Sequence, residues 1–350
     1  MRHRLVTERE IVAAVLARHS PGAAEKYVQE ILWRTYWKGW LEMRPAVWAR
    51  FLEERDRKRE EAGDSDAVHC AERGETGIDG FDHWSRELVA TGYLHNHARM
   101  WFASIWIFTL RLPWVLGADF FLRHLVDADA ASNTLSWRWV AGLQTVGKTY
   151  QATAENIERY TNGRFAPAGL AGDAVALSEP PVEAAADLPR VVPHEARNPA
   201  LLLVTHEDLH PESVFAADAS FGSAIVVADR DLLWGGAARD FAQAAAEDTA
   251  KRVRTHFGCN TEVTARLDAA SLVAAAQARG LRQIATPYTP IGPVADALAR
   301  IGPVLAGEGI SLNPVRRAWD ERFWPHAKRG FFPFKKRIPA LLREEGLLGD

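Results

Sequence analysis

The stretch "ALLLVTH" at residues 200–206 opens the part of the chain that decides the fold class. It is a short apolar run, which is typical of a strand buried in a sheet. Three similar runs follow it: "SAIVVAD" at 223–229, "TEVTARL" at 261–267 and "RQIATPY" at 282–288. Helical patterns alternate with these runs, around residues 237–255, 270–278 and 293–300. This alternation predicts a parallel, doubly wound, Rossmann-like α/β domain over residues 200–350.

The half of the chain before these strands, up to about Phe165, is predicted to be all-α. Thr7 and Glu10 have the spacing of a capping box, so a helix should begin there. A long helix is expected from about Ala23 to Met43, ended by Pro45. Further helices are expected over the residues that lead into the charged segment 53–66, and near residues 81–90, 97–112 and 118–125.

The stretch 172–199 separates the two halves. It is rich in proline, alanine and acidic residues and has no helical apolar stripe, so we interpret it as a linker. The expected domains are therefore residues 1–171, the linker 172–199, and residues 200–350.

Composition excludes several function classes. With a formal net charge of −3, a globally basic nucleic-acid binder is not expected, and any DNA contact has to be a local patch. Cys70 and Cys259 lack the spacing of a disulfide framework or a metal site, which fits a reducing cytoplasm. The apolar run 100–112 is too short to span a bilayer, and no secretory signal follows the basic start. No glycine fingerprint follows the first strand, so a dinucleotide site is not predicted there.

Three stretches in the helical half could carry chemistry. In the first, Tyr27, Glu30, Arg34 and Trp37 fall on one stripe of a helix, and Trp33 flanks it. A structural interpretation of this stretch is an ion pair between Glu30 and Arg34 on a tryptophan-rich packing face.

The second stretch, "GYLHNHARM" at residues 92–100, gathers two histidines, an asparagine and an arginine beside an apolar helix. It is either a solvated helix start or the floor of a pocket.

The third stretch, residues 125–142, carries Asp127, Asp129 and Asn133, followed by two tryptophans. Paired aspartates suit Mg²⁺, but no phosphate-cradling loop accompanies them. An alternative interpretation is that Asp129 and Asn133 cap helices.

Together, "QEILWR", "TGYLHNHARM" and "LVDADAASNTLSWRW" resemble the flavin-binding domain of the photolyase and cryptochrome family in order and spacing. The family patterns run Glu-x-x-Trp-Arg, His-Asn-x-x-Arg-Met and Asp-x-Asp-x-x-x-Asn-x-x-x-Trp-x-Trp. The resemblance covers about residues 5–170 and implies an all-α domain with FAD as its cofactor.

The resemblance also implies a role for each matching position. Asn133 matches the residue that faces flavin N5, and Asp127 matches the carboxylate that pairs with Arg99 beside the isoalloxazine. Asp129 matches a carboxylate near the polar edge of that ring. The complete flavin-binding set that the resemblance implies is Tyr27, Arg34, Arg99, Asp127, Asp129 and Asn133.

Other positions match the substrate site and an electron-transfer chain. Glu30 and Asn96 resemble the polar pair that contacts a pyrimidine dimer. Trp137 and Trp114 match the first two members of the chain of tryptophans that reduces the flavin. The third member is absent from the segment before "GETGIDGFDHW", and the possible substitutes are Trp84, Trp106 and Trp37. The residues implied to bind the flipped bases are Trp33, His97, Met100 and Trp139.

By the same resemblance, the function is light-dependent repair of cyclobutane pyrimidine dimers in DNA, a deoxyribodipyrimidine photo-lyase reaction. Basic groups such as His97, Arg99, Arg138 and Lys148 would hold the DNA. Asn96 stands where six-four enzymes tend to place histidine, which favours cyclobutane dimers. The alternatives are a cryptochrome-like blue-light photoreceptor without repair activity and a degenerate, flavin-free interaction module. A second antenna chromophore is left unassigned.

Two features depart from the family pattern. The α/β half follows the flavin domain, whereas an antenna domain usually precedes it. The segment 330–344 resembles the Phe-x-Pro-Phe segment that closes such a domain, so we interpret the α/β half as antenna-like and in swapped order. The hydroxyl-rich stretch that holds the flavin diphosphate should lie just before residue 2. Either this stretch lies upstream of the sequence or the diphosphate is held differently, with Arg2, His3 and Arg4 as a positive cluster or a solvated end.

Overall fold

The computed structural model describes residues 1–63, 65–191 and 198–349. Contacts group the chain into two compact units. The first consists of Met1–Arg44, Ala184–Leu233 and Arg239–Asp350, and the second of Pro45–Glu183 and Trp234–Ala238. These units divide the chain at other places than the domains predicted above, whose boundaries stay a prediction.

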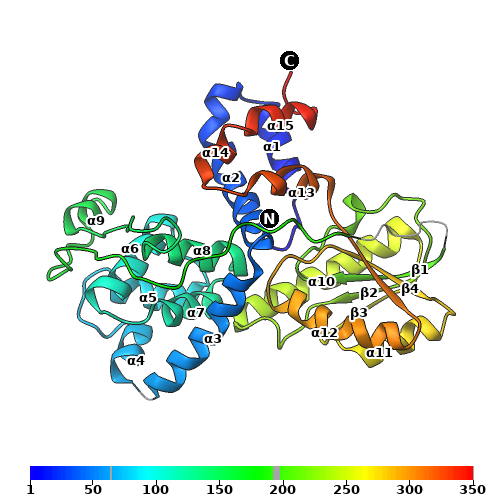
Figure 1. The fold of residues 1–350 in the computed structure, drawn as a ribbon, viewed down its shortest axis with the longest axis horizontal. Coiled ribbons are helices and arrows are strands. Elements are labelled where there is room, and N and C mark those ends of the chain that lie inside the picture. Colours follow the sequence, from blue (N-terminus) through cyan, green and yellow to red (C-terminus); the bar gives the residue numbers. More distant parts are fainter. Residues whose placement is uncertain (64, 192–197, 350) are drawn as a thin grey trace. The chain divides into compact units, whose positions relative to one another are not determined.

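The first unit contains a five-stranded sheet (Figure 1). Its strands are β1 (Ala200–Thr205), β2 (Phe221–Val227), β3 (Thr261–Thr264), β4 (Gln283–Pro287) and β5 (Ser311–Val315). They lie in the order β3-β2-β1-β4-β5, and all neighbouring pairs are parallel. The predicted parallel sheet is therefore confirmed. The edge strand β5 was not predicted because Asn313 and Pro314 interrupt its apolar pattern, and an edge strand tolerates proline.

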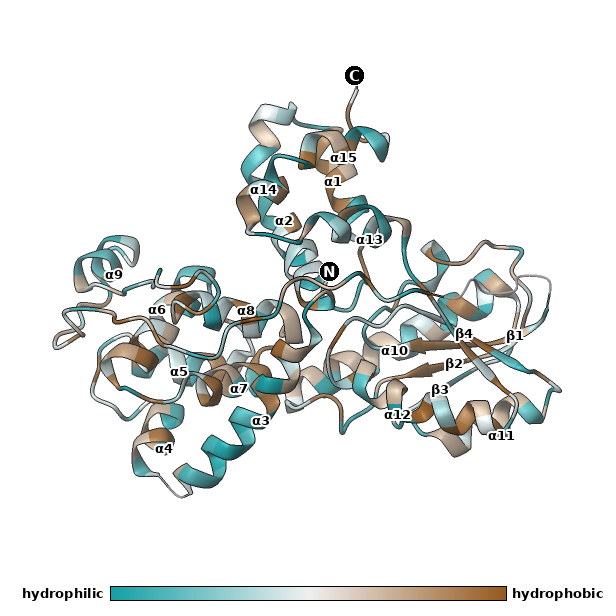
Figure 2. Cartoon of the chain, viewed as in Figure 1, coloured by the Kyte–Doolittle hydropathy of each residue, from teal (hydrophilic) through white to brown (hydrophobic). Residues whose placement is uncertain are grey.

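Three helices connect the strands: α10 (Gly236–Phe257), α11 (Ala269–Gln277) and α12 (Pro293–Gly307). Residues of α11 and α12 share a buried cluster with strand residues such as Leu203 and Ile284. Right-handed crossovers then require α10 to lie on the opposite face, because its connection runs in the other direction across the sheet. Figure 2 shows the inner strands β1 and β2 as strongly hydrophobic, as expected for strands covered on both faces of a sheet.

The first unit also contains a helical module made from both ends of the chain (Figure 1). Its members are α1 (Glu8–Leu16), α2 (Pro21–Glu42), α13 (Ala318–Phe323), the short turn η3 (Trp324–His326), α14 (Phe331–Lys335) and α15 (Ile338–Glu344). Another short turn, η2 (Pro211–Ser213), follows β1. The predicted capping box is present, since the Thr7 backbone donates to Glu10 at 2.7 Å and the Glu10 backbone donates to Thr7 Oγ1 at 3.3 Å. Helix α2 packs closely on η3 at Gly39, where a Cβ would lie 2.9 Å from the Trp324 Cα.

The first residues of the chain are buried, so the solvated end considered above is wrong. Arg4 is 2% exposed and makes two hydrogen bonds to Asp320, at 2.7 and 2.8 Å. Arg2 donates to both carboxylate oxygens of Glu207 at 2.5 and 2.7 Å, and the His3 ring is within hydrogen-bond distance of a backbone carbonyl that follows β1. The guanidinium groups of Arg2 and Arg4 thus neutralise buried carboxylates, and these ion pairs hold both side chains in place.

The second unit is all-α in its described residues. Its helices are α3 (Pro45–Ala62), α4 (Asp66–Arg73), α5 (Phe81–Thr91), α6 (Asn96–Ser104), α7 (Trp114–His124), α8 (Ala130–Val140) and α9 (Ala154–Tyr160), with a π-helical turn η1 (Ile105–Thr109). The helix predicted over 97–112 is α6 followed by η1. It ends because Arg111 adopts a left-handed conformation and Pro113 precedes α7. Figure 2 shows that the charged outer part of α3 is hydrophilic. None of the described helices combines the length and apolar character that crossing a bilayer requires.

A buried carboxyl group ties α2 to the sheet within the first unit. Glu42 is 3% exposed and accepts hydrogen bonds from the Tyr288 hydroxyl and the Ile291 backbone, both at 2.6 Å. Burial raises its pKa to about 7, against the lowering effects of these two hydrogen bonds and of Arg316.

Glu42→Gln should therefore change how stability depends on pH. The folded-state pKa lies above the unfolded value, so Glu42 binds more protons when folded, and its contribution falls as pH rises from about 4.5 to about 7. We expect the unfolding free energy of the parent, minus that of Glu42→Gln, to fall by up to about 3 kcal/mol over this range in urea titrations. The exposed Glu262→Gln is the matched control and should track the parent. A pH-independent difference for Glu42→Gln would contradict the assignment.

Candidate functional site

The residues implicated from the sequence fall into two sets, one in each unit. Tyr27, Glu30, Trp33 and Arg34 all lie on α2 in the first unit. The second unit holds the others, on α6, α7, α8 and the turn between α7 and α8: Asn96, His97, Arg99, Met100, Trp114, Asp127, Asp129, Asn133, Trp137 and Trp139.

On α2 the side chains of Tyr27 and Glu30 are exposed, whereas Trp33 is half-buried. The Trp33 ring stacks on Phe331 of α14, with ring centroids 3.5 Å apart and planes 11° apart. Its edge meets Tyr36 at 5.7 Å. This arrangement agrees with the packing-face interpretation of the stripe, because one flat face of Trp33 is already covered.

In the second unit, the turns that precede α6 and α8 are joined. The Val126 backbone donates to the Gly92 carbonyl at 3.0 Å. Gly92 has φ +69°, and a Cβ there would lie 2.6 Å from Val126 Cγ2, so only glycine fits. Arg99 adds an ion pair to Asp127 at 3.1 Å and a hydrogen bond to the Leu94 carbonyl at 2.9 Å. The pairing of Arg99 with Asp127 is therefore present, and it leaves both side chains partly exposed at the start of the two helices.

The start of α6 is largely solvated, as the first interpretation of "GYLHNHARM" proposed. Asn96 is the first residue of the helix and is exposed. His97 is half-buried, with its ring centroid 5.2 Å from Tyr160 and 5.7 Å from Trp101. Met100 is half-buried. The polar groups thus form an accessible surface next to the pair of Arg99 and Asp127.

The structure of helix α8 shows which of its polar residues act as helix caps. Asp129 is its N-cap and accepts from the Ser132 backbone at 2.8 Å. Asn133 lies inside the helix, so the capping interpretation is wrong for it, and its Nδ2 donates to the Ala118 carbonyl of α7 at 2.8 Å. Among the described residues no group of three or more histidine, cysteine, aspartate or glutamate side chains could hold a metal ion.

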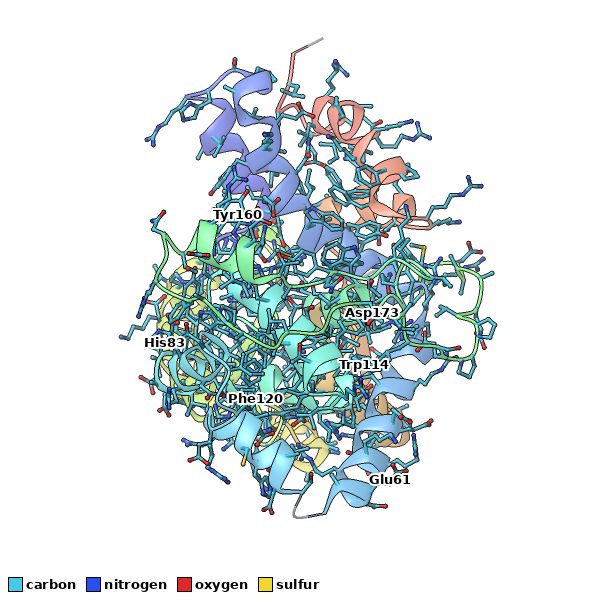
Figure 3. All side chains as sticks on the ribbon, turned by 90° about the vertical axis from the view of Figure 1, so that its left-hand side faces the viewer. Glu61, His83, Trp114, Phe120, Tyr160 and Asp173 are labelled. Carbon is cyan, nitrogen blue, oxygen red and sulfur yellow. The ribbon has the colours of Figure 1, made fainter. Side chains whose placement is uncertain are left out.

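Trp137 is the centre of the aromatic core of this unit. Its ring rests on α7 at Gly117, where a Cβ would lie 2.6 Å from Trp137 Cζ3 and 3.0 Å from Trp106 Cδ2. It packs edge-on against Phe121 at 5.1 Å and against Trp106 at 6.3 Å. Trp114 begins the same helix α7, one turn before Gly117 (Figure 3). The close approach of α7 and α8 thus brings Trp137 to the helix that carries Trp114.

Of the three possible substitutes for the third tryptophan, Trp106 is next to Trp137 but is completely buried. Trp84 stacks on Trp101 at 5.4 Å, and Trp37 belongs to the first unit.

A different series of rings, which the sequence did not suggest, leads outward from Trp114. Phe51 lies 5.7 Å from Trp114, Trp48 stacks on Phe51 at 5.3 Å, and the half-buried Trp234 stacks on Trp48 at 6.2 Å. Trp234 was missed because it lies in the sequence among the α/β elements.

The residues of α8 suit a polar ligand. Ser132 Oγ, Thr134 Oγ1 and Trp137 Nε1 are buried and have no hydrogen-bond partner within the described part of the chain. An unmet buried polar group costs about 1–3 kcal/mol, so a ligand that met any of these groups would be stabilised. These groups lie on either side of Asn133 and include the ring assigned to electron transfer, which fits a flavin held along α8.

The structure bears on two of the side chains proposed to contact DNA, Arg138 and Lys148. Arg138 is 2% exposed and forms a bidentate ion pair with Glu179, so the interpretation of Arg138 as a DNA-docking group is wrong. Lys148 is exposed and stays available. Trp139 is half-buried, with its ring stacked on Tyr150 at 5.7 Å.

Gly117→Ala should destabilise the protein because the added methyl group overlaps the Trp137 ring. Overpacking of this kind costs about 1–3 kcal/mol in unfolding free energy, measured by urea denaturation. The control Gly302→Ala lies inside α12 with open space around the new methyl group and should be neutral or slightly stabilising. Adding Trp137→Phe to Gly117→Ala should relieve the clash. If Gly117→Ala were as stable as the control, the contact between α7 and α8 would be looser than described.

Comparison with known proteins shows what the helical part of the chain is similar to. Residues 27–165 match the model of the FAD binding domain of DNA photolyase. Among curated proteins, the deoxyribodipyrimidine photo-lyase of Streptomyces griseus is 40% identical over 131 residues, which is 37% of this chain and 28% of that protein. Those of Alkalihalophilus pseudofirmus and Salmonella typhimurium are each 32% identical, over 41% and 37% of this chain and 30% and 28% of their own lengths.

The chain thus spans less than a third of the length of these relatives. The comparison with solved structures gave no significant match. The matched residues include every one of the candidate positions on α2, α6, α7 and α8. Residues 27–165 are therefore similar to the FAD-binding domain of DNA photolyase, and this match supports FAD as the cofactor.

Proposed function

We propose that this chain is a flavoprotein that repairs cyclobutane pyrimidine dimers in DNA under blue light, a deoxyribodipyrimidine photo-lyase reaction. The observation that carries the proposal is the joined start of α6 and α8. There the accessible Asn96 and the pair of Arg99 and Asp127 lie beside a helix in which three buried polar atoms have no partner in the described part of the chain. When bound, reduced FAD supplies light absorption and the single electron that opens the dimer ring and then returns.

The flavin would be held by residues of the second unit. The Nδ2 hydrogen bond to Ala118 fixes the Asn133 amide, which leaves its carbonyl oxygen free to face a ring nitrogen. We assign Arg99 and Asp127 to the polar edge of the isoalloxazine, since their pair is partly exposed and fixed in place by Leu94 and Val126. The role of Asp129 is to hold the start of α8, and thereby Asn133, in position.

The DNA would be engaged at the start of α6. A dimer has to leave the duplex before an electron can reach it over a short distance, and flipping costs a few kcal/mol, least where stacking is already damaged. Asn96 is accessible for hydrogen bonds to a flipped base, and His97 and Lys148 offer contacts to phosphates. Met100 and Trp139 supply half-buried apolar surface for the bases. We assign Glu30 the role of a hydrogen-bond donor to the dimer.

Electrons for reducing the flavin would pass through the aromatic core. Indole is readily oxidised, and Trp137 rests on the helix that begins with Trp114. From Trp114, the rings of Phe51, Trp48 and Trp234 offer a route to a half-buried position. We therefore assign Trp234 as the outer member of the chain.

One observation favours a blue-light photoreceptor as the second candidate. The ring of Trp33, which the resemblance implies packs against a flipped base, has one face stacked on Phe331. A receptor without a DNA substrate would keep FAD and the tryptophans but would not need this face.

Glu30→Ala, which removes the donor, should slow repair without loss of FAD. A hydrogen bond to a charged group contributes about 1.5–3 kcal/mol, so the rate of dimer loss should fall roughly 10- to 100-fold. The measurement is the loss of thymine dimers from an irradiated oligonucleotide under blue light, with the full chain loaded with FAD and a dark sample beside it. Glu25→Ala, which removes an exposed carboxylate on the same helix, is the control and should repair at the parent rate.

Each alternative predicts a different result in this experiment. Repair by Glu30→Ala at the parent rate would remove the role assigned to Glu30. FAD uptake without any light-dependent loss of dimers would favour the photoreceptor. If the protein took up no FAD on titration, the result would favour the flavin-free interaction module.

A further inference from the structure

The second unit contains a cavity that none of the proposed flavin-holding residues lines. Its volume is about 930 Å³, within the range of small-molecule sites. It lies between α3, the turn that joins η1 to α7, and the extended segment 171–180 (Figure 3). Its lining includes Trp114 and Arg138 and lacks Arg99, Asp127 and Asn133.

The outer wall of this cavity is fixed in place. The segment 171–180 forms neither helix nor strand, yet hydrogen bonds attach it at several points to the helical body. The Leu177 backbone donates to the Ala141 carbonyl at 3.0 Å, and Gln151 donates to the Ala171 carbonyl at 2.8 Å. The buried Arg138 donates two hydrogen bonds to the Glu179 carboxylate, one of 2.6 Å. The cavity is therefore preformed.

The floor of the cavity is aromatic and apolar. Trp114 is half-buried and lines it, with Phe51 5.7 Å away and Leu143 nearby on the same lining. A planar ring that packs on an indole gains about 1–3 kcal/mol, which makes this floor suited to a flat aromatic molecule.

The charges that line the cavity are unbalanced in favour of cations. Arg111 has no ion pair or hydrogen-bond partner among the described residues, and Arg50 donates only to the Pro180 carbonyl, at 2.9 Å. Of the carboxylates on the lining, Glu54 pairs with Arg57 at 2.6 Å and Glu179 with Arg138, which leaves the exposed Asp173. The two guanidinium groups have planar forks that match a carboxylate or phosphate.

The conformation of Arg111 supports a function for its side chain. It has φ +54°, a left-handed conformation that is rare for a long side chain. Glycine would adopt this conformation without strain, so an arginine here is explained more simply by what its exposed side chain does.

We propose that this cavity binds a small planar aromatic anion, with the ring on Trp114 and the acidic group between Arg50 and Arg111. The site goes beyond the proposed repair function, because binding there requires neither FAD nor DNA. A molecule in this place would contact a ring that the proposed function uses for electron transfer.

The test uses 2-naphthoate as the probe and its uncharged analogue 2-naphthamide as the matched ligand, titrated calorimetrically into the full chain. We expect the carboxylate to bind at least ten times more tightly than the amide. Arg111→Glu should weaken binding of the carboxylate at least tenfold and leave the amide unchanged. Arg164→Glu, an exposed arginine of the same unit outside the cavity, should bind both ligands like the parent.

The other outcomes overturn the proposal. No binding of 2-naphthoate by the parent removes the site, and equal affinities for the two ligands remove the preference for an anion. The titrations are done with and without saturating FAD. If FAD displaced the probe, the cavity would belong to the flavin site. Failure of the chain to take up FAD or repair dimers would leave the result with the probe unaffected, so the two proposals fail separately. If Arg111→Glu proved unstable, Arg50→Gln offers the same comparison.

Discussion

The contact between Trp137 and Gly117 is the constraint on which the candidate site depends. Without a side chain at Gly117, α7 and α8 approach until an indole fills the space between them. This fixes α8 against α7, and the hydrogen bond from Asn133 to the Ala118 carbonyl is possible only at that separation. The position of Asp127 and its pair with Arg99 then follow, since the turn that carries Asp127 leads directly into α8. A packing requirement in the core thus determines the geometry of the polar surface at the start of the helices.

Much of the fold could be predicted from local patterns. The strands β1 to β4 are apolar runs with clear boundaries, and the start of α1 is encoded by Thr7 and Glu10 alone. The misses have physical causes. Pro314 hides the edge strand β5 from a hydrophobicity pattern, and the helix predicted over 97–112 ends early because Arg111 turns left-handed before Pro113. Helix α8 begins with alanines and continues with polar residues and tryptophans, so it has no simple apolar stripe, and its burial comes from packing between helices.

The residues of the candidate site also differ in how far the sequence could predict them. The motif residues could be placed by resemblance, and the pair of Arg99 and Asp127 agrees with it. Features that depend on pairing between distant residues could not be predicted. The burial of Arg138 requires Glu179, and the position of Trp234 beside Trp48 requires the chain to return from the sheet. For the same reason the cavity beside Trp114 has no counterpart in any motif, since its walls come from four separate parts of the chain.

The composition of the helical module has a consequence for how the protein is made. Helix α2 packs against η3, α13 and α14, which the ribosome adds about 280 residues later. Residues 45–183 of the second unit are contiguous, so this part can collapse while synthesis continues. Helix α2, with Trp33 and Trp37, must wait for Phe331 and Trp324 with its apolar side uncovered. During translation this helix therefore keeps an apolar surface exposed until residues 318–335 have been made, and such a surface is a target for chaperones.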